Sequence, residues 1–410
     1  MLSVSEALEK ILVHFSPLPA QPVSIQNVLG RVLASQVASG YDLPHFNNSS
    51  VDGFAVRWQD TLSASPSSPV QLAVIADIPA GSMSDLTLSA GQAARIMTGA
   101  PIPVGADAVV MVEDTNQSRV PSGSPLPATV AVGKAVSASE NIRNKGDDLA
   151  AGQVVLTAGH MLRPQDVGML AMLGIAEVAV HRRPRVAILS SGDELVAPGR
   201  SLQPGQIHDS NNPMLEALVQ QAGCEVINLG VARDNLQDVS RVFSSAIQQQ
   251  PDLIISTAGV GTGVFDYIRN VVDQNGGLSF WRVNMRPGKP LAFGNVAGIP
   301  FFGLPGNPVS SYVSFQVFVR PALAILRGLE GLPFTTIRAR LSHDLSSDGR
   351  QSYLRAIVST EASGYQASLA GHQGSGNLFS TVQANALLII PAGVTSCPAN
   401  SVWDAWLLDS

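Results

Sequence analysis

The first 15 residues place apolar side chains at helical intervals. These side chains recur every three or four positions, so they would share one face of a helix. They are Leu2, Val4, Ala7, Leu8, Ile11, Leu12 and Phe15. The pattern predicts an amphipathic opening helix, and we expect Ser5 to cap its start.

From Val23 to about Val180 the pattern changes to short runs that are rich in strand-forming residues and separated by Gly, Pro and Ser turns. Two polar, proline-rich stretches in this region, Ser63–Pro69 and Ser118–Pro127, are typical of exposed loops. The region is therefore predicted to be predominantly β. Its clearest predicted strands are Val70–Ile75, Ala94–Met97, Ala108–Glu113 and Gln153–Leu156.

After Pro184 apolar strands alternate with helical stretches. Such alternation predicts a central three-layer α/β domain with a mainly parallel sheet. Ligands of these folds bind at the carboxyl ends of the strands, so residues that follow a strand are candidate site residues. The expected strands are Val186–Leu189, Glu225–Leu229 and Leu253–Ser256, and the expected helices are Met214–Ala222 and Leu236–Gln249.

The pattern changes once more near the C-terminus. An apolar helix is predicted over Val309–Leu326, and Ile337–Ser410 returns to short strand-like runs such as Ala386–Ile390 and Val402–Leu407. We therefore expect a small C-terminal β domain. The chain as a whole is predicted to be a multidomain protein of α+β and α/β class.

Composition narrows the classes of ligand and compartment. The 410 residues carry a formal net charge of −6, which disfavours a broad basic surface for nucleic acid and favours a small-molecule partner. The N-terminus does not resemble a signal peptide, and no run approaches the roughly 20 apolar residues that span a bilayer. Cys224 and Cys397 have no partners at the spacing of a zinc site. We expect a cytoplasmic protein that makes no membrane contact.

A glycine-rich loop follows the predicted strand Leu253–Ser256. Glycines allow successive backbone N–H groups to converge on an anion, and Asp266, three residues after the last glycine, could hold a magnesium ion that bridges phosphate oxygens. The alternative is an ordinary strand-to-helix turn, and the spacing of a dinucleotide fingerprint is absent. The candidate residues are Thr257, Gly259, Gly261, Thr262 and Gly263.

Two further turns combine rigid backbone with polar groups. Arg282 precedes Arg286-Pro287-Gly288-Lys289-Pro290, where prolines would fix cationic side chains near one point. Gly303–Pro308 stands before the apolar helix, and its Pro305 and Pro308 would fix a sharp bend at which Gly306 and Asn307 present backbone amides. A solvated turn is the alternative for each, but three anion-binding turns on one sheet favour a site.

Acidic residues follow another predicted strand. Glu194 lies beyond Val186–Leu189, so it would reach the same edge of the sheet as Asp266 and could share a metal ion with it. Asp209 or Ser210 is expected to cap the next helix, and His208 is interpreted as structural.

The N-terminal half contains three polar segments. Asp52 stands before Gly53, Thr98 follows the run Ala94–Met97, and Asp148 ends a loop of cations and acids that begins at Asn141. A turn or a solvated loop explains each segment on its own.

Taken together, these segments resemble the molybdopterin molybdenumtransferase family, which includes bacterial MoeA and the larger domain of gephyrin. The resemblance covers nearly the whole chain and implies a β-rich N-terminal region at 1–180, with one of its two subdomains inserted at about 50–145. It also implies a molybdopterin-binding α/β domain at 181–330 and a β-barrel-like domain at 331–410. The segments that carry it are Asn48–Gly53, Arg95–Pro103, Arg143–Asp148, Ser191–Leu195, Asp252–Asp266, Arg286–Pro290 and Gly303–Pro308.

The resemblance implies that adenylylated molybdopterin and molybdate are the substrates, and that the phosphoanhydride is cleaved with release of AMP. Phosphate would be held by Thr257–Gly263 and Pro305–Pro308, and Mg²⁺ by Glu194 and Asp266. The oxyanion would be bound by Arg282, Arg286, Lys289, Arg355 and the Ser375 turn.

The family also implies a homodimer in which Asp52, Thr98 and Asp148 complete the site of the other subunit, with the molybdopterin adenylyltransferase as a candidate partner. The chain departs from the usual family pattern at Asn47, at Ser50-Val51 and over Thr257–Gly261, and it has Arg282 and Arg286 where Lys is common. Two alternatives are an adenylyltransferase-like enzyme and a non-catalytic scaffold that binds pterin.

Overall fold

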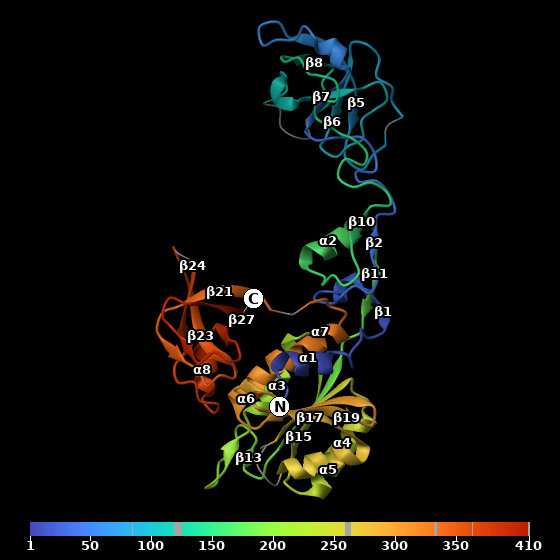
Figure 1. Cartoon of the computed structure of the whole chain (residues 1–410). Coiled ribbons are helices and arrows are strands. Elements are labelled where there is room, and N and C mark those ends of the chain that lie inside the picture. The colour runs from blue at the N-terminus through green and yellow to red at the C-terminus, as the bar shows by residue number, and fades with distance from the viewer. Residues whose placement is uncertain (84, 119–124, 259–263, 332–333, 363, 409–410) are drawn as a thin grey trace. The chain divides into compact units, whose positions relative to one another are not determined.

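The computed structural model describes residues 1–83, 85–118, 125–258, 264–331, 334–362 and 364–408. The chain forms two compact units. One consists of Met1–Ser35 together with Ala158–Ser410, and the other of Gln36–Thr157. Figure 1 shows the elements of both.

The unit Gln36–Thr157 is built on a five-stranded sheet in the order β7-β4-β6-β5-β8. Gly53 in β4 lies against β7 so closely that a Cβ atom would stand 1.9 Å from the carbonyl oxygen of Val110, so only glycine fits there. Strands of two or three residues form the pairs β2 (Val37–Ala38) with β10 (Val154–Leu156) and β3 (Asn48–Ser49) with β9 (Ile142–Arg143). The sheet strands are β4 (Gly53–Val56), β5 (Val70–Ile78), β6 (Gln92–Ile96), β7 (Ala108–Met111) and β8 (Thr129–Val132).

Both faces of this sheet are covered. Phe54 and Val56 of β4 belong to one buried cluster, and Ala55 between them belongs to another. Alternate residues of a strand point to opposite faces, so the sheet lies between two small cores. The β-rich character predicted for the N-terminal region is confirmed here.

The second unit begins with α1 (Val4–Leu12). The predicted cap was wrong by two residues: Ser3, not Ser5, accepts the backbone N–H of Glu6, while the Glu6 carboxylate accepts the N–H of Ser3. This reciprocal capping box satisfies two N–H groups at the helix start, which Ser5 inside the first turn cannot do. Strands β1 (Ala20–Ser24) and β11 (Glu177–His181) follow as an antiparallel pair. Helix α2 (Pro164–Met172) lies in the stretch predicted to be β.

The central sheet has the order β15-β12-β16-β20-β19-β17. Strands β15, β12, β16 and β20 run parallel, and β19 and β17 are antiparallel to their neighbours. The mainly parallel sheet is confirmed. Its strands are β12 (Arg185–Ser191), β15 (Glu225–Ala232), β16 (Leu253–Ala258), β17 (Gly276–Arg282), β19 (Pro290–Val296) and β20 (Ile299–Pro305).

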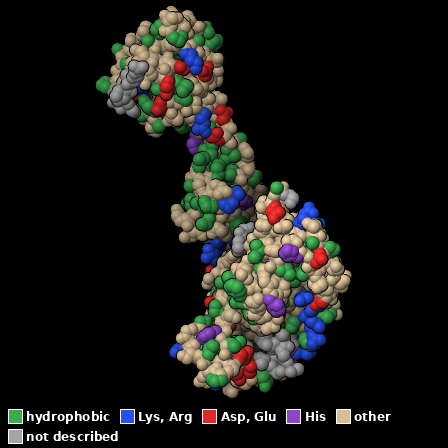
Figure 2. All heavy atoms as spheres, turned by 90° about the vertical axis from the view of Figure 1, so that its left-hand side faces the viewer, with side chains coloured by type: hydrophobic (Ala, Val, Ile, Leu, Met, Phe, Trp, Pro, Cys, Tyr) green, Lys and Arg blue, Asp and Glu red, His purple; other side chains and the backbone are tan. Residues whose placement is uncertain are grey.

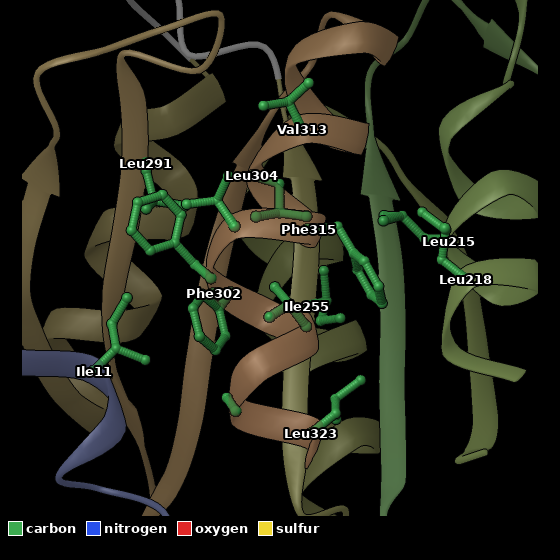
Figure 3. Close-up of a cluster of buried hydrophobic side chains, with 14 of the residues drawn as sticks. Ile11, Leu215, Leu218, Ile255, Leu291, Phe302, Leu304, Val313, Phe315 and Leu323 are labelled. Atoms are coloured by element: carbon green, nitrogen blue, oxygen red, sulfur yellow. The ribbon is translucent and has the colours of Figure 1, made fainter. Parts of the chain in front are cut away.

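Helices cover both faces of the central sheet. Ile188 of β12 packs in one cluster with Leu215 of α3, with Phe315 and with Ile11 of α1, while Leu189 packs in the other with α4 and α5. Figure 3 shows the first cluster between the sheet and the helices. The covering helices are α3 (Asn211–Gln221), α4 (Leu236–Gln248) and α5 (Val264–Asn275).

The predicted apolar helix spans Pro308–Leu326. It consists of α6 (Pro308–Ser314), a π-helical turn over Phe315–Val319 and α7 (Arg320–Leu326). Within its 19 residues, an 18-residue window has a mean hydropathy of 1.4, enough for a membrane span by composition, but 83% of that window is buried inside the protein. It is a core helix, and among the described residues it is the one helix that meets this criterion.

The C-terminal region is a closed β-barrel. Strands β23, β24, β21, β27 and β25 pair in that order, and a further pairing of β23 with β25 closes the ring. The two-residue strand β18 (Met285–Arg286) of the central region pairs parallel with the start of β23. The barrel therefore stands against the turn that contains Arg286. Its strands are β21 (Thr336–Leu341), β23 (Gln351–Glu361), β24 (Gly364–Leu369), β25 (Ala386–Ile390) and β27 (Val402–Leu407).

Candidate active site

A cleft of about 370 Å³ lies where the central domain meets the barrel. Among the described residues its lining contains three cations and no carboxylate. Two of the turns singled out in the sequence meet here, and a third, from the barrel, joins them. The lining residues are Arg286, Pro287, Gly288, Lys289, Pro290, Pro305, Asn307, Ser310, Arg350, Gln373, Gly374 and Ser375.

The turn Arg286–Pro290 supplies two of the cations. Gly288 has φ +103°, and a Cβ atom there would stand 2.7 Å from Ser314 Oγ, so the tight turn depends on glycine. The backbone N–H of Val283 donates to the Lys289 carbonyl at 3.0 Å and closes the turn. Among the described residues, no carboxylate oxygen is recorded within 4.0 Å of Lys289 Nζ.

The turn Gly303–Pro308 supplies polar groups at the start of the core helix. The Asn211 side-chain amide donates to the Gly306 carbonyl at 2.7 Å and fixes this turn against α3. Asn307 precedes Pro308, whose missing N–H costs nothing at the first helical position. Asn307 and the buried Ser310 both line the cleft.

The barrel contributes the turn His372–Ser375. The Asn307 side-chain amide donates to Ser375 Oγ at 3.0 Å, and the backbone N–H of Val309 donates to the Ser375 carbonyl at 3.1 Å. The N–H of Gly374 donates to Nδ1 of His372 at 3.1 Å. Two of these bonds fasten the barrel turn to the start of the core helix.

Arg355 lies behind this turn and is not part of the cleft lining. It is fully buried, and it donates to Ser380 Oγ at 3.1 Å and to the Gly374 carbonyl at 3.1 Å. Its Nη1 has no partner among the described residues. Burial, and secondly the charge of Arg286, lowers the pKa of Arg355 to about 10. The structure therefore places Arg355 as the support of the turn that carries Ser375.

Arg350 is a cleft cation that the sequence analysis missed. It stands at the start of β23, and its Nη1 donates to the Met285 carbonyl at 3.3 Å. In the sequence, Asp348-Gly349-Arg350 resembles an ordinary solvated turn. Only the pairing of β18 with β23 brings Arg350 beside Arg286, so no local signal could have revealed it.

The carboxyl ends of β12 and β16 carry the next group of candidates. Thr257 is buried, and its hydroxyl shares a hydrogen bond of 3.0 Å with Ser190. Glu194 beyond β12 and Asp266 in the first turn of α5 are exposed. Because β12 and β16 are parallel neighbours, these carboxylates lie at one edge of the sheet. The predicted residues Gly259, Gly261, Thr262 and Gly263 lie outside the described residues.

Asp234, which the sequence analysis missed, belongs to the same edge. It accepts the Ser191 hydroxyl at 2.8 Å, and its backbone N–H donates to Asp193 Oδ1 at 3.2 Å. Its position after β15 was a usable signal, since acids that follow parallel strands meet at one edge. Nearby, Asp209 rather than Ser210 caps α3, because its Oδ1 accepts the N–H groups of Asn211 and Asn212.

The unit Gln36–Thr157 holds Asp52, Thr98 and Asp148. Thr98 donates its backbone N–H and its hydroxyl to Asp52 Oδ1, at 2.7 and 2.8 Å. These two bonds stabilise the carboxylate and hold the pKa of Asp52 below its ordinary value, with the backbone bond as the larger cause. Asp148 pairs with Arg143.

Arg282 does not line the cleft. Its guanidinium stacks 3.8 Å from the centroid of the exposed Trp281 ring. It lies opposite Pro290 in the β17–β19 pairing, next to the cation turn but outside it. His208 is exposed in the short strand β14 (Ile207–His208).

Three family models together match most of the chain. Residues 2–174 match the MoeA N-terminal region (domain I and II), residues 187–325 match a probable molybdopterin binding domain, and residues 338–408 match the MoeA C-terminal region (domain IV).

Curated relatives are similar to this chain over nearly its full length. The chain is 40% identical over 392 residues to molybdopterin molybdenumtransferase 2 of Mycobacterium tuberculosis, covering 94% of each chain. It is 34% identical over 411 residues to the molybdopterin molybdenumtransferase of Staphylococcus epidermidis, covering 100% of this chain and 96% of the relative.

Solved structures of MoeA proteins are similar to this chain over its full length. Two structures titled as the molybdopterin biosynthesis MoeA protein of Pyrococcus horikoshii superpose over 100% of both chains, with TM-scores of 0.84 and 0.80 at 32% and 30% identity. The resemblance seen in the sequence motifs is thereby confirmed, and the chain belongs to the MoeA family, whose curated members are named molybdopterin molybdenumtransferases.

Proposed function

We propose that this protein transfers molybdenum from molybdate to adenylylated molybdopterin, with cleavage of the phosphoanhydride and release of AMP. The observation that carries the proposal is the cleft, where Arg286, Lys289 and Arg350 surround amide and hydroxyl donors. Cations and fixed donors of this kind attract and orient a tetrahedral dianion such as molybdate. The names of the curated MoeA relatives support the same reaction.

In this proposal the cleft binds the oxyanion. Lys289 provides an ammonium with no recorded carboxylate partner among the described residues, and Arg286 and Arg350 provide guanidinium groups. Ser375 provides a hydroxyl. Arg355 acts through the turn that it supports, since its guanidinium donates to the Gly374 carbonyl.

The phosphates of the pterin substrate would lie at the carboxyl ends of the strands. Thr257 lies near the carboxyl end of β16 and Pro305 ends β20, and these two strands are parallel neighbours. The start of the core helix at Pro308 adds partial positive charge there. The two substrates would thus meet at Pro305–Asn307, which borders both the cleft and the carboxyl ends of the strands.

Magnesium is the expected cofactor, and two carboxylates fit it. Neither Glu194 nor Asp266 has a recorded side-chain partner among the described residues, and both are exposed. No group of three or more His, Cys, Asp or Glu side chains is placed for a metal in the described part of the chain. Mg²⁺ commonly takes one or two protein carboxylates and completes its shell with phosphate oxygens and water. Bound there, it would neutralise charge on the phosphate oxygens.

We further propose a homodimer in which Asp52, Thr98 and Asp148 complete the site of the partner subunit. A carboxylate that two donors keep ionised, as Thr98 does for Asp52, is suited to accept a proton or bind a cation. The substrate would be supplied by the molybdopterin adenylyltransferase, in the cytoplasm.

Active-site complementation tests the shared site. Asp52→Asn and Asp266→Ala subunits are each expected to be inactive as homodimers. After subunit exchange, half of the dimers are mixed and each has one intact site, so about a quarter of the native activity should return. Recovery of no activity in proven mixed dimers would overturn the shared site.

The reaction itself is tested with purified protein, Mg²⁺, molybdate and adenylylated molybdopterin. We expect release of AMP that depends on molybdate. If no AMP appears, the proposed function is wrong. If the protein instead consumes ATP with molybdopterin, it is an adenylyltransferase.

A further inference from the structure

One carboxylate lies between two of the three cleft cations. Asp348, in the turn before β23, accepts both Nη2 and Nε of Arg350 on its Oδ2, the latter at 3.0 Å. Nη1 of Arg286 lies 3.8 Å from the same oxygen. The other oxygen, Oδ1, accepts the backbone N–H of Arg350 at 3.1 Å. Asp348 itself is not part of the cleft lining, so it acts on the cleft through the two arginines.

The two arginines are held differently. Arg350 is fixed by Asp348 and by the Met285 carbonyl, whereas the 3.8 Å separation of Arg286 from Asp348 exceeds hydrogen-bond length. Arg286 can therefore turn toward a ligand while Arg350 stays in place. The three side chains are 34–39% exposed, so solvent screens these pairs and they add little to folding stability. Their larger effect is on the charge that a bound anion meets.

We infer that Asp348 is a positioning residue that sets anion specificity: it competes with the bound oxyanion for Arg286 and thereby weakens the binding of dianions. The inference rests on the proposed function only in taking the cleft as the oxyanion site. An entering dianion must share the Arg286 guanidinium with the Asp348 carboxylate. The negative charge of that carboxylate also repels the dianion. A monoanion of the same shape meets half of that repulsion, because Coulomb energy scales with charge. Asp348 therefore reduces the preference of the cleft for dianions over monoanions.

The test is Asp348→Asn, which removes the charge and keeps the shape and an oxygen that can accept from Arg350. Binding of molybdate, a dianion, and perrhenate, a tetrahedral monoanion, is measured by titration calorimetry on the full chain. We expect the Kd for molybdate to fall about two- to fivefold and that for perrhenate to fall less, with the gain shrinking at high salt. Unchanged or weaker molybdate binding, or an equal gain for both anions, would overturn the inference.

Asp404→Asn is the matched control. Asp404 pairs with Arg338 at 3.3 Å on the same barrel, neither residue lines the cleft, and the change removes the same formal charge. It should leave both Kd values unchanged. In an Arg286→Gln background only the direct repulsion between Asp348 and the dianion remains, so Asp348→Asn should improve molybdate binding less than it does in the native protein. A full gain there would rule out competition for Arg286.

The binding assay contains no pterin, so its outcome is independent of AMP release. Tighter molybdate binding without AMP release would overturn the proposed function and leave the role of Asp348 standing. If the native protein releases AMP but Asp348→Asn does not change molybdate binding, the proposed function stands and the role of Asp348 is overturned.

Discussion

The side-chain amide of Asn307 donates a hydrogen bond of 3.0 Å to the hydroxyl of Ser375, and this bond joins the start of the core helix to the barrel beside the cleft. A second hydrogen bond, from the backbone N–H of Val309 to the Ser375 carbonyl at 3.1 Å, joins the same two segments. Figure 2 shows basic side chains on the surface of the molecule, coloured apart from acidic ones.

Ser375→Ala removes the hydroxyl and leaves the Asn307 amide without this acceptor. The loss of one hydrogen bond costs about 0.5–1.5 kcal/mol, so the Kd for molybdate should rise about two- to tenfold. Titration calorimetry measures it. Ser342→Ala is the control, because Ser342 donates to the Ala367 carbonyl in the same barrel at 3.1 Å and does not line the cleft. Equal effects of both changes would contradict a role for Ser375 in the cleft.

Thr98→Val removes one of the two hydrogen bonds that stabilise the Asp52 carboxylate. The pKa of Asp52, which these bonds hold below its ordinary value, should rise toward that value but not reach it, because the backbone N–H remains. The acidic limb of the pH–activity profile should move to higher pH in the same sense. NMR titration of Asp52 measures the shift, and the exposed Thr129→Val on β8 provides the control. An unchanged pKa of Asp52 would show that the Thr98 hydroxyl does not stabilise the carboxylate.

Asp266→Asn should raise the Mg²⁺ concentration needed for half-maximal AMP release by at least about tenfold, since an amide is a weaker magnesium ligand than a carboxylate. Asp273→Asn changes another exposed acid on the same helix and should leave the Mg²⁺ requirement as it is. A scaffold protein would tolerate Asp266→Asn, so full complementation of a deficient strain by this variant would favour the non-catalytic alternative.

Asp166→Asn tests the cap of α2. The buried Asp166 accepts the backbone N–H of Arg163 at 2.8 Å and pairs with His160 at 2.7 Å. The Arg163 side chain is the first cause that lowers the pKa of Asp166, so this stabilisation is present above the ordinary pKa of aspartate and is lost as pH falls through the lowered value.

At neutral pH we expect Asp166→Asn to lower the free energy of unfolding by about 1–3 kcal/mol. The difference from the native protein should shrink in acid. Urea unfolding at several pH values measures both. The half-exposed Asp404→Asn is the control and should change the free energy of unfolding by less than about 0.5 kcal/mol. A penalty that does not depend on pH would mean that charge is not the cause.

Much of this protein follows from the sequence by itself. Periodicity determined the opening helix, the alternating strands and helices of the central domain and the core helix, because each of these depends on which local face is apolar. The turns Arg286–Pro290 and Gly303–Pro308 were found for a similar reason: their Gly and Pro residues restrict the backbone locally.

Tertiary structure alone showed which side chains join these turns in one cleft. Arg350 enters the cleft only because β23 pairs with β18, and Asp348 lies between two arginines that are 64 positions apart in sequence. Barrel closure also buried Arg355 behind the turn it supports, although the family resemblance had implied that it binds the oxyanion. Charge and turn chemistry are local properties of a sequence, whereas the distance between two side chains depends on long-range strand pairing, which no local pattern encodes.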